Sequence, residues 1–156
     1  MSVYDYEYEW DSRYCYPNSN VLKNKLGITD GAALAVAERE ITAATVAGIM
    51  DKPVRGKLDF KHLCGIHHAI FRDIFDWAGQ PRTVNISKGN PFCMSNVITE
   101  YAEDIFGKLK REDFLLGKSP DEMIKRLTYY LSEINVLHPF REKLGLDRTE
   151  RNISIS

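Results

Sequence analysis

Near the end of the chain, four polar side chains have types and spacings that suit chemistry on a phosphate compound. His138 is followed four residues later by Glu142, and Arg148 and Arg151 come next. Imidazole is the usual general base near neutral pH. A carboxylate beside phosphates is a natural Mg²⁺ ligand. Two arginines three residues apart would share one face of a helix, and guanidinium groups suit phosphate oxygens.

The element that would position His138 is a helix that ends at this residue. The sequence at 119–122, Ser-Pro-Asp-Glu, has a cap, a proline for the first helical position and acidic residues for the first turn. Pro139 disfavours helix in the residue before it, so the helix should stop at His138. Apolar residues recur between these limits at helical spacing: Met123, Leu127, Tyr130, Leu131, Ile134 and Leu137.

The rest of the chain indicates further helices and one hairpin. Helical periodicity predicts helices over 32–50, from a cap at Asp59 to near 77–79, and over 97–109, with a short one at 21–26. Alternation over 82–87, followed by a turn signal at 88–91, predicts strands. The sequence therefore predicts a mainly α domain over 1–156, with one short β-hairpin at 82–92 and an extended arm at 1–20.

Composition narrows the function classes. The chain has 156 residues, a formal net charge of −1 and 44% hydrophobic residues, so a folded domain without direct nucleic-acid binding is expected. Cys15, Cys64 and Cys93 form neither a disulfide framework nor a zinc pattern. Neither a signal peptide nor a membrane span is evident, and a cytoplasmic location is expected. Of the adjacent His67 and His68, one should face the core and the other solvent, so a metal pair is not expected.

The residues around His138 resemble the motif of the Fic family, His-x-Phe-x-(Asp/Glu)-Gly-Asn-(Gly/Lys)-Arg-x-x-Arg. The match holds at His138, Phe140 and Glu142, and Pro139 is frequent in the family. The likeness covers most of the chain and is closest to the bacterial cell-filamentation toxins. It extends to Tyr16-Pro17, 21–27, Ile66-His67, 76–79 and 82–89.

The resemblance implies an enzyme that transfers AMP from ATP to a hydroxyl side chain of a target protein. His138 would deprotonate the hydroxyl, Phe140 would anchor the loop in the core, and Glu142 would bind Mg²⁺ between the ATP phosphates. Gly145, Arg148 and Arg151 would help to bind the nucleotide. The hairpin would be a flap that pairs with an extended target segment by strand addition. Its residues would be Thr83, Val84, Asn85, Ile86, Ser87, Lys88 and Gly89.

After Glu142 the chain departs from the family motif. Lys-Leu-Gly-Leu-Asp at 143–147 stands where the family has Gly-Asn-Gly, and the spacing to Arg148 is two residues too long. The motif at 138–151 is thus degenerate, and the C-terminus is expected to be truncated. A frameshift near codon 143 would explain both features.

These departures predict impaired transfer and leave two alternatives. One is a catalytically inactive Fic remnant that binds an antitoxin or a target protein. The other is an interaction module that uses the arm. The inhibitory motif of the family has no good match here, the nearest being Thr99 with Glu103 and Asp104, so restraint would come from a separate antitoxin protein or from a lost C-terminus. Exposed core surface would favour a homo-oligomer.

Overall fold

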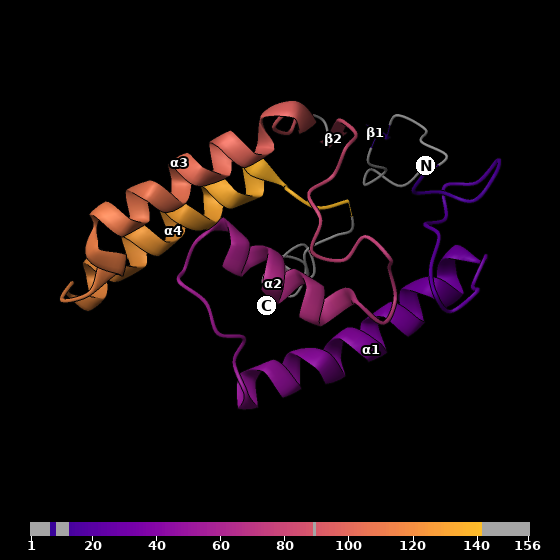
Figure 1. The fold of residues 1–156 in the computed structure, drawn as a ribbon, viewed down its shortest axis with the longest axis horizontal. Helices are drawn as coiled ribbons and strands as arrows, with labels where there is room; N and C mark the ends of the chain where they lie inside the picture. Colours follow the sequence, from indigo (N-terminus) through magenta and orange to yellow (C-terminus); the bar gives the residue numbers. More distant parts are fainter. Residues whose placement is uncertain (1–6, 9–12, 89, 142–156) are drawn as a thin grey trace.

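The computed structural model describes residues 7–8, 13–88 and 90–141. Four α-helices form the body, each packed on the next one along the chain (Figure 1). The mainly α prediction with a hairpin is confirmed. The helices are α1 (Gly31–Asp51), α2 (Phe60–Phe71), α3 (Ile98–Arg111) and α4 (Pro120–Leu137), with 3₁₀ turns η1 (Ser95–Val97) and η2 (Asp113–Leu115).

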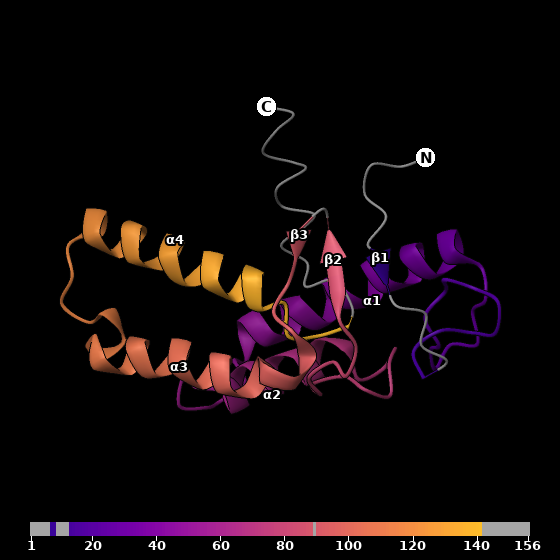
Figure 2. The same cartoon turned by 90° about the horizontal axis from the view of Figure 1, so that it is seen from above.

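Three short strands form a small antiparallel sheet in the order β1-β2-β3. The predicted hairpin consists of β2 (Ile86–Lys88) and β3 (Asn90–Pro91). It stands beside the C-terminal end of α4 and the start of α3 (Figure 2). The third strand, β1 (Glu7–Tyr8), was not predicted. It pairs with the other edge of β2, with Glu7 opposite Ser87 and Tyr8 opposite Ile86.

Side-chain caps begin three of the helices, and those at Asp59 and Ser119 were predicted from the sequence. Asp30 accepts a hydrogen bond from the amide of Ala33 at 2.9 Å, and Asp59 accepts one from the amide of His62 at 2.8 Å. Ser119 forms a capping box with Glu122. Each cap contributes about 1 kcal/mol because it satisfies an amide that has no partner within its helix.

The predicted helix at 21–26 is wrong. Leu22 instead forms an isolated bridge with Cys15. The side chain of Asn24 donates to the carbonyls of Leu22 and Ile28 and accepts from the amide of Ile28. An asparagine that bonds to nearby backbone groups competes with helix formation, and here it fixes an ordered loop.

Two apolar clusters hold the helices together, and a third lies beneath the hairpin. One joins α2, α3, η2 and α4 through Phe60, Ile98, Ala102, Ile105, Leu115, Tyr130 and Leu137. The second joins α1 to α2 and the loop after α2 through Leu34, Phe71, Ile74, Phe75 and Ala78. The third holds β2 against the N-terminal segment through Tyr14, Cys15, Val84 and Ile86. Leu137, the last residue of α4, belongs to the first of these clusters.

A polar cluster around Glu112 ties the end of α3 to α4. The carboxylate lies 2.8 Å from Nε of Arg126 and accepts a hydrogen bond from the Tyr130 hydroxyl. The next residues, from Asp113 to Leu115, all have positive φ values, which disfavour residues other than glycine. The ion pair holds the chain across this strained turn.

Acid should weaken this cluster. The hydrogen bond from Arg126, followed by that from Tyr130, lowers the pKa of Glu112 below its ordinary 4.5. A carboxyl group with a lowered folded-state pKa stabilises the protein above its unfolded-state pKa, and this contribution disappears as pH falls through the folded value. Glu112→Gln should therefore lower the urea midpoint near pH 7, and the difference from wild type should shrink by about pH 3.

The matched control is Asp113→Asn, which removes a neighbouring charge outside the Glu112–Arg126 pair. If the difference in urea midpoint between Glu112→Gln and wild type stayed constant from neutral to acidic pH, the stabilising role of the Glu112 carboxylate would be contradicted.

Candidate functional site

His138 lies at the turn where α4 stops. Its amide donates to the carbonyl of Ile134 at 2.9 Å and closes the helix, while its own φ of 39° and ψ of 66° are left-handed. The ring stacks on Phe92 with centroids 4.5 Å apart, and the residue is only 8% exposed. The predicted stop before Pro139 is confirmed. The result is an imidazole held between the end of α4 and the end of the hairpin.

Arg82 connects these two elements through backbone carbonyls. Its Nε donates to His138 at 2.7 Å and its NH1 group to Val84 at 2.7 Å. Its NH2 group donates to Cys93 and, at 3.3 Å, to Leu137. One side chain, 2% exposed, thus bonds both sides of the hairpin base and the last carbonyls of α4.

The charge of Arg82 is balanced by dipoles. Burial lowers the pKa of Arg82, but the ordinary value is so high that the guanidinium stays charged. The carbonyls of Leu137 and His138 lie at the C-terminus of α4, where the helix dipole is negative and favours a cation. The Arg82 amide also donates to the carbonyl of Pro139 at 2.8 Å. Both the backbone and the side chain of Arg82 therefore bind the turn that follows α4.

Phe140 anchors the loop after His138. It is 1% exposed and stacks on the ring of His67, with centroids 3.8 Å apart. Nδ1 of His67 accepts a hydrogen bond from the amide of Gly79 at 2.8 Å, so that nitrogen carries no proton. Gly79 has a φ of +80°, and a Cβ there would come within 2.7 Å of the Cys64 carbonyl. His67 is buried and His68 is exposed, as predicted.

Arg141 is a buried site residue that the sequence analysis missed. Its guanidinium carbon lies 5.6 Å from the centroid of the Tyr14 ring, and its NH2 group is 3.7 Å from Sγ of Cys15. These contacts join the loop after His138 to the N-terminal segment. No spacing rule in the sequence could signal this pairing, because the partners are 126 positions apart.

Some of the predicted flap residues are buried and support the fold, whereas others are exposed. Val84 and Ile86 are buried against the N-terminal segment, and the hydroxyl of Thr83 lies 3.2 Å from that of Tyr14. Asn85 accepts a hydrogen bond from the amide of Ser95 at 2.9 Å. Ser87 and Lys88 pair with β3 through their backbone. Both edges of β2 are therefore occupied, one by β3 and the other by β1.

The sequence profile of the Fic/DOC family matches residues 57–143, more than half of the chain. The chain belongs to this family. The matched range includes His138, Phe140 and Glu142 and ends at Lys143, the first residue of the segment that departs from the Fic motif.

Named relatives and solved Fic domains agree with this membership. The chain is 44% identical over 135 residues to the "Probable protein adenylyltransferase Fic" of Salmonella typhimurium, covering 85% of this chain and 66% of that protein. It is 38% identical to the protein adenylyltransferase VbhT of Bartonella schoenbuchensis, covering 85% of this chain and 28% of that protein. The chain thus spans just under two thirds of the Salmonella relative.

Among solved structures, the chain resembles the N-terminal Fic domain of a VirB-translocated Bep effector from Bartonella quintana, crystallised with bound ADP. The TM-score is 0.79 at 27% identity, covering 85% of this chain and 70% of that one. The N-terminal Fic domain of a Bep effector from Bartonella sp. AR 15-3 gives a TM-score of 0.78 at 25% identity, covering 88% and 68%.

Several predicted Fic site residues lie outside the described residues: Gly89, Glu142, Gly145, Arg148 and Arg151. Within the described part of the chain, no group of three His, Cys, Asp or Glu residues could hold a metal ion. The same part contains no helix that is long and apolar enough to cross a membrane. The structure thus describes the part of the predicted site that contains His138.

Replacing Arg82 should destabilise the protein strongly. Arg82→Met leaves buried carbonyls at the α4 turn and the hairpin without donors, each costing about 1–3 kcal/mol. We expect a total loss of roughly 3–5 kcal/mol in the free energy of unfolding. Arg82→Lys should fall between Arg82→Met and wild type, because an ammonium cannot reach all of these acceptors. Urea denaturation measures the free energy of unfolding of wild type, Arg82→Met and Arg82→Lys.

Arg55→Met is the matched control because Arg55 is exposed. Equal losses at positions 82 and 55 would contradict the role assigned to the Arg82 guanidinium.

Proposed function

We propose that this domain transfers AMP from ATP to a hydroxyl side chain of a target protein. In this reaction the target hydroxyl gives its proton to His138 while its oxygen attacks the α-phosphorus of ATP. The bond from that phosphorus to the β-phosphate oxygen breaks, and pyrophosphate leaves. The observation that carries the proposal is the placement of His138, fixed at the end of α4 by Arg82 and stacked on Phe92. The names of the Salmonella and Bartonella relatives support the reaction class.

The nucleotide would bind on the C-terminal side of His138. ADP bound to the Fic domain from Bartonella quintana supports a nucleotide site in this fold. Glu142 would hold Mg²⁺, which neutralises phosphate charge, and Gly145, Arg148 and Arg151 would contribute to phosphate binding. Arg141 directly precedes Glu142, so its burial would fix where the nucleotide-binding segment begins.

The target would bind along the hairpin as an extended segment. The proposed flap comprises 82–92, within one Fic domain over 1–156 that has an arm at 1–20 and a motif at 138–151. Because β2 is paired on both edges, a target strand would use the outer edge of β3 or exchange with β1. We place the reaction in the cytoplasm, since Cys15, Cys64 and Cys93 are free thiols.

One observation favours a second candidate, an inactive Fic remnant that binds an antitoxin or target protein. The family match ends at Lys143, where the expected Gly-Asn-Gly is replaced by Lys-Leu-Gly-Leu-Asp. Backbone amides of a glycine-rich turn at a helix start form the usual phosphate nest. Leu144 and Asp147 would replace this polar surface with an apolar side chain and a negative charge.

The two candidates differ in their response to ATP. We expect weak binding by calorimetry in the presence of Mg²⁺, and a low transfer rate from α-labelled ATP into protein. His138→Ala should reduce transfer by about 10²–10⁴-fold without changing ATP affinity, because loss of a general base affects the chemical step. Replacing 143–147 by Gly-Asn-Gly restores the family spacing to Arg148 and should strengthen binding.

A folded wild-type chain that binds no ATP, together with a repaired chain that does, would establish the remnant. Transfer that survives in His138→Ala would contradict the assigned base.

We also propose that the chain self-associates through α4. Ile124, Leu127 and Leu131 lie on one helical face and are exposed, Ile124 at 63%. Burying such a stripe contributes about 25 cal/mol per Å². Leu127→Glu together with Leu131→Glu should abolish association in sedimentation velocity at high concentration, whereas Lys125→Glu on the same helix should not. A wild-type chain that stays monomeric throughout would rule out this interface.

A further inference from the structure

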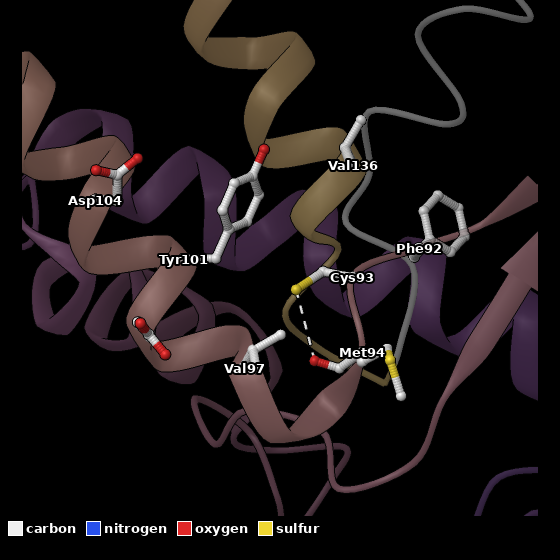
Figure 3. A pocket seen from close by; sticks show the side chains of 8 residues that line it. Phe92, Cys93, Met94, Val97, Tyr101, Asp104 and Val136 are labelled. Atoms are coloured by element: carbon white, nitrogen blue, oxygen red, sulfur yellow. Dashed lines mark hydrogen bonds between the residues drawn. The ribbon is translucent and has the colours of Figure 1, made fainter.

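An open groove lies beside the end of the hairpin, next to the residue that stacks on His138. It has a volume of about 840 Å³, within the usual range for ligand sites. Met94, Val97 and Val136 give it exposed apolar walls, and the Cys93 thiol lies between them (Figure 3). The described residues that line it are Phe92, Cys93, Met94, Val97, Glu100, Tyr101, Asp104 and Val136.

Two hydrogen bonds hold the backbone of Cys93 at the wall of the groove. The amide of Cys93 donates to the carbonyl of Val136 at 3.0 Å, and the Cys93 carbonyl accepts from Arg82. Phe92 is part of the groove on one side and packs on the His138 ring on the other. A segment bound in the groove would therefore lie next to the candidate base.

The charged side chains of the groove are acidic. Glu100 and Asp104 lie one helical turn apart on α3, and Asp104 is paired with Lys108 at 3.2 Å. The Tyr101 hydroxyl donates to Glu133 at 2.5 Å, which raises the pKa of Tyr101 to about 12. No lysine or arginine belongs to the described lining. The groove therefore disfavours phosphates and favours a cation, with Glu100 as the carboxylate best placed to receive it.

We infer that this groove binds a segment of the target protein that carries an apolar side chain and a lysine or arginine. The apolar side chain would cover Met94, Val97 and Val136, and the cation would pair with Glu100. That the partner is the target protein rests on the proposed AMP transfer. The preference of the groove for an apolar side chain and a cation does not depend on that proposal. Glu100 would then be a specificity-determining residue for the choice of target.

The first test uses Cys93 as a reporter of the local potential. The full chain is treated with cationic trimethylammonioethyl or anionic sulfonatoethyl methanethiosulfonate, and peptide mass mapping measures the labelling rate at Cys93. The ratio of the two rates removes any change in the thiol pKa, which burial raises. Glu100→Gln should lower the cation-to-anion ratio by about threefold.

Glu103→Gln is the matched control, since Glu103 lies on the same helix and lines a separate hollow. It should leave the ratio near the wild-type value. Equal ratios in wild type and Glu100→Gln would overturn the role of Glu100.

The second test measures binding of short fluorescein-labelled peptides by anisotropy. Each peptide carries one hydroxyl residue and one leucine, and lysine, norleucine or glutamate is moved along the remaining positions. At least one lysine peptide should bind roughly fivefold more tightly than its norleucine counterpart. Glu100→Gln should remove this preference, and Glu103→Gln should keep it.

These outcomes separate the groove from the reaction. Lysine-selective binding without any AMP transfer would leave the groove in place and refute the proposed activity. AMP transfer with no lysine preference, or no peptide binding at all, would overturn the groove and leave the activity standing.

Discussion

The arrangement of the site depends on one buried cation. Arg82 bonds to carbonyls on both sides of the hairpin base and to the carbonyls of Leu137 and His138 at the C-terminal end of α4. A buried guanidinium needs several acceptors, and a helix C-terminus offers carbonyls without partners in the helix. The guanidinium thus gives these carbonyls a donor, and the carbonyls give the guanidinium its acceptors. These hydrogen bonds fix the position of His138, because its own carbonyl is one of the acceptors.

His138 is supported by residues of the described helical body. Phe140 packs on His67, which in turn holds the amide of Gly79, and all of these contacts lie within the described helical body. The residues proposed to bind phosphate come after Arg141. They follow directly in the sequence on the loop that Phe140 and Arg141 hold in the core.

Local rules were enough to predict the helices and the stop at His138, because caps and prolines act on their immediate neighbours. His67 and His68 face different ways because adjacent residues of a helix point in different directions around its axis. The contacts of Arg82 could not be predicted, since they join residues 55 and 56 positions apart through backbone atoms. The helix predicted at 21–26 failed for a local reason. The side chain of Asn24 bonds to the backbone of Leu22 and Ile28 and stabilises a loop in place of a helix.

The pairing of β1 with β2 bears on how any partner meets the hairpin. Glu7 and Tyr8 occupy one edge of β2 and belong to the same chain as the hairpin. A tethered strand has a local concentration on the order of millimolar, so a free strand competes at a disadvantage for the same edge. However, only two residues of β1 pair with β2, so the pairing is weak. A partner strand can therefore displace β1 to an extent that increases with its own concentration and with the contacts it makes beyond the strand.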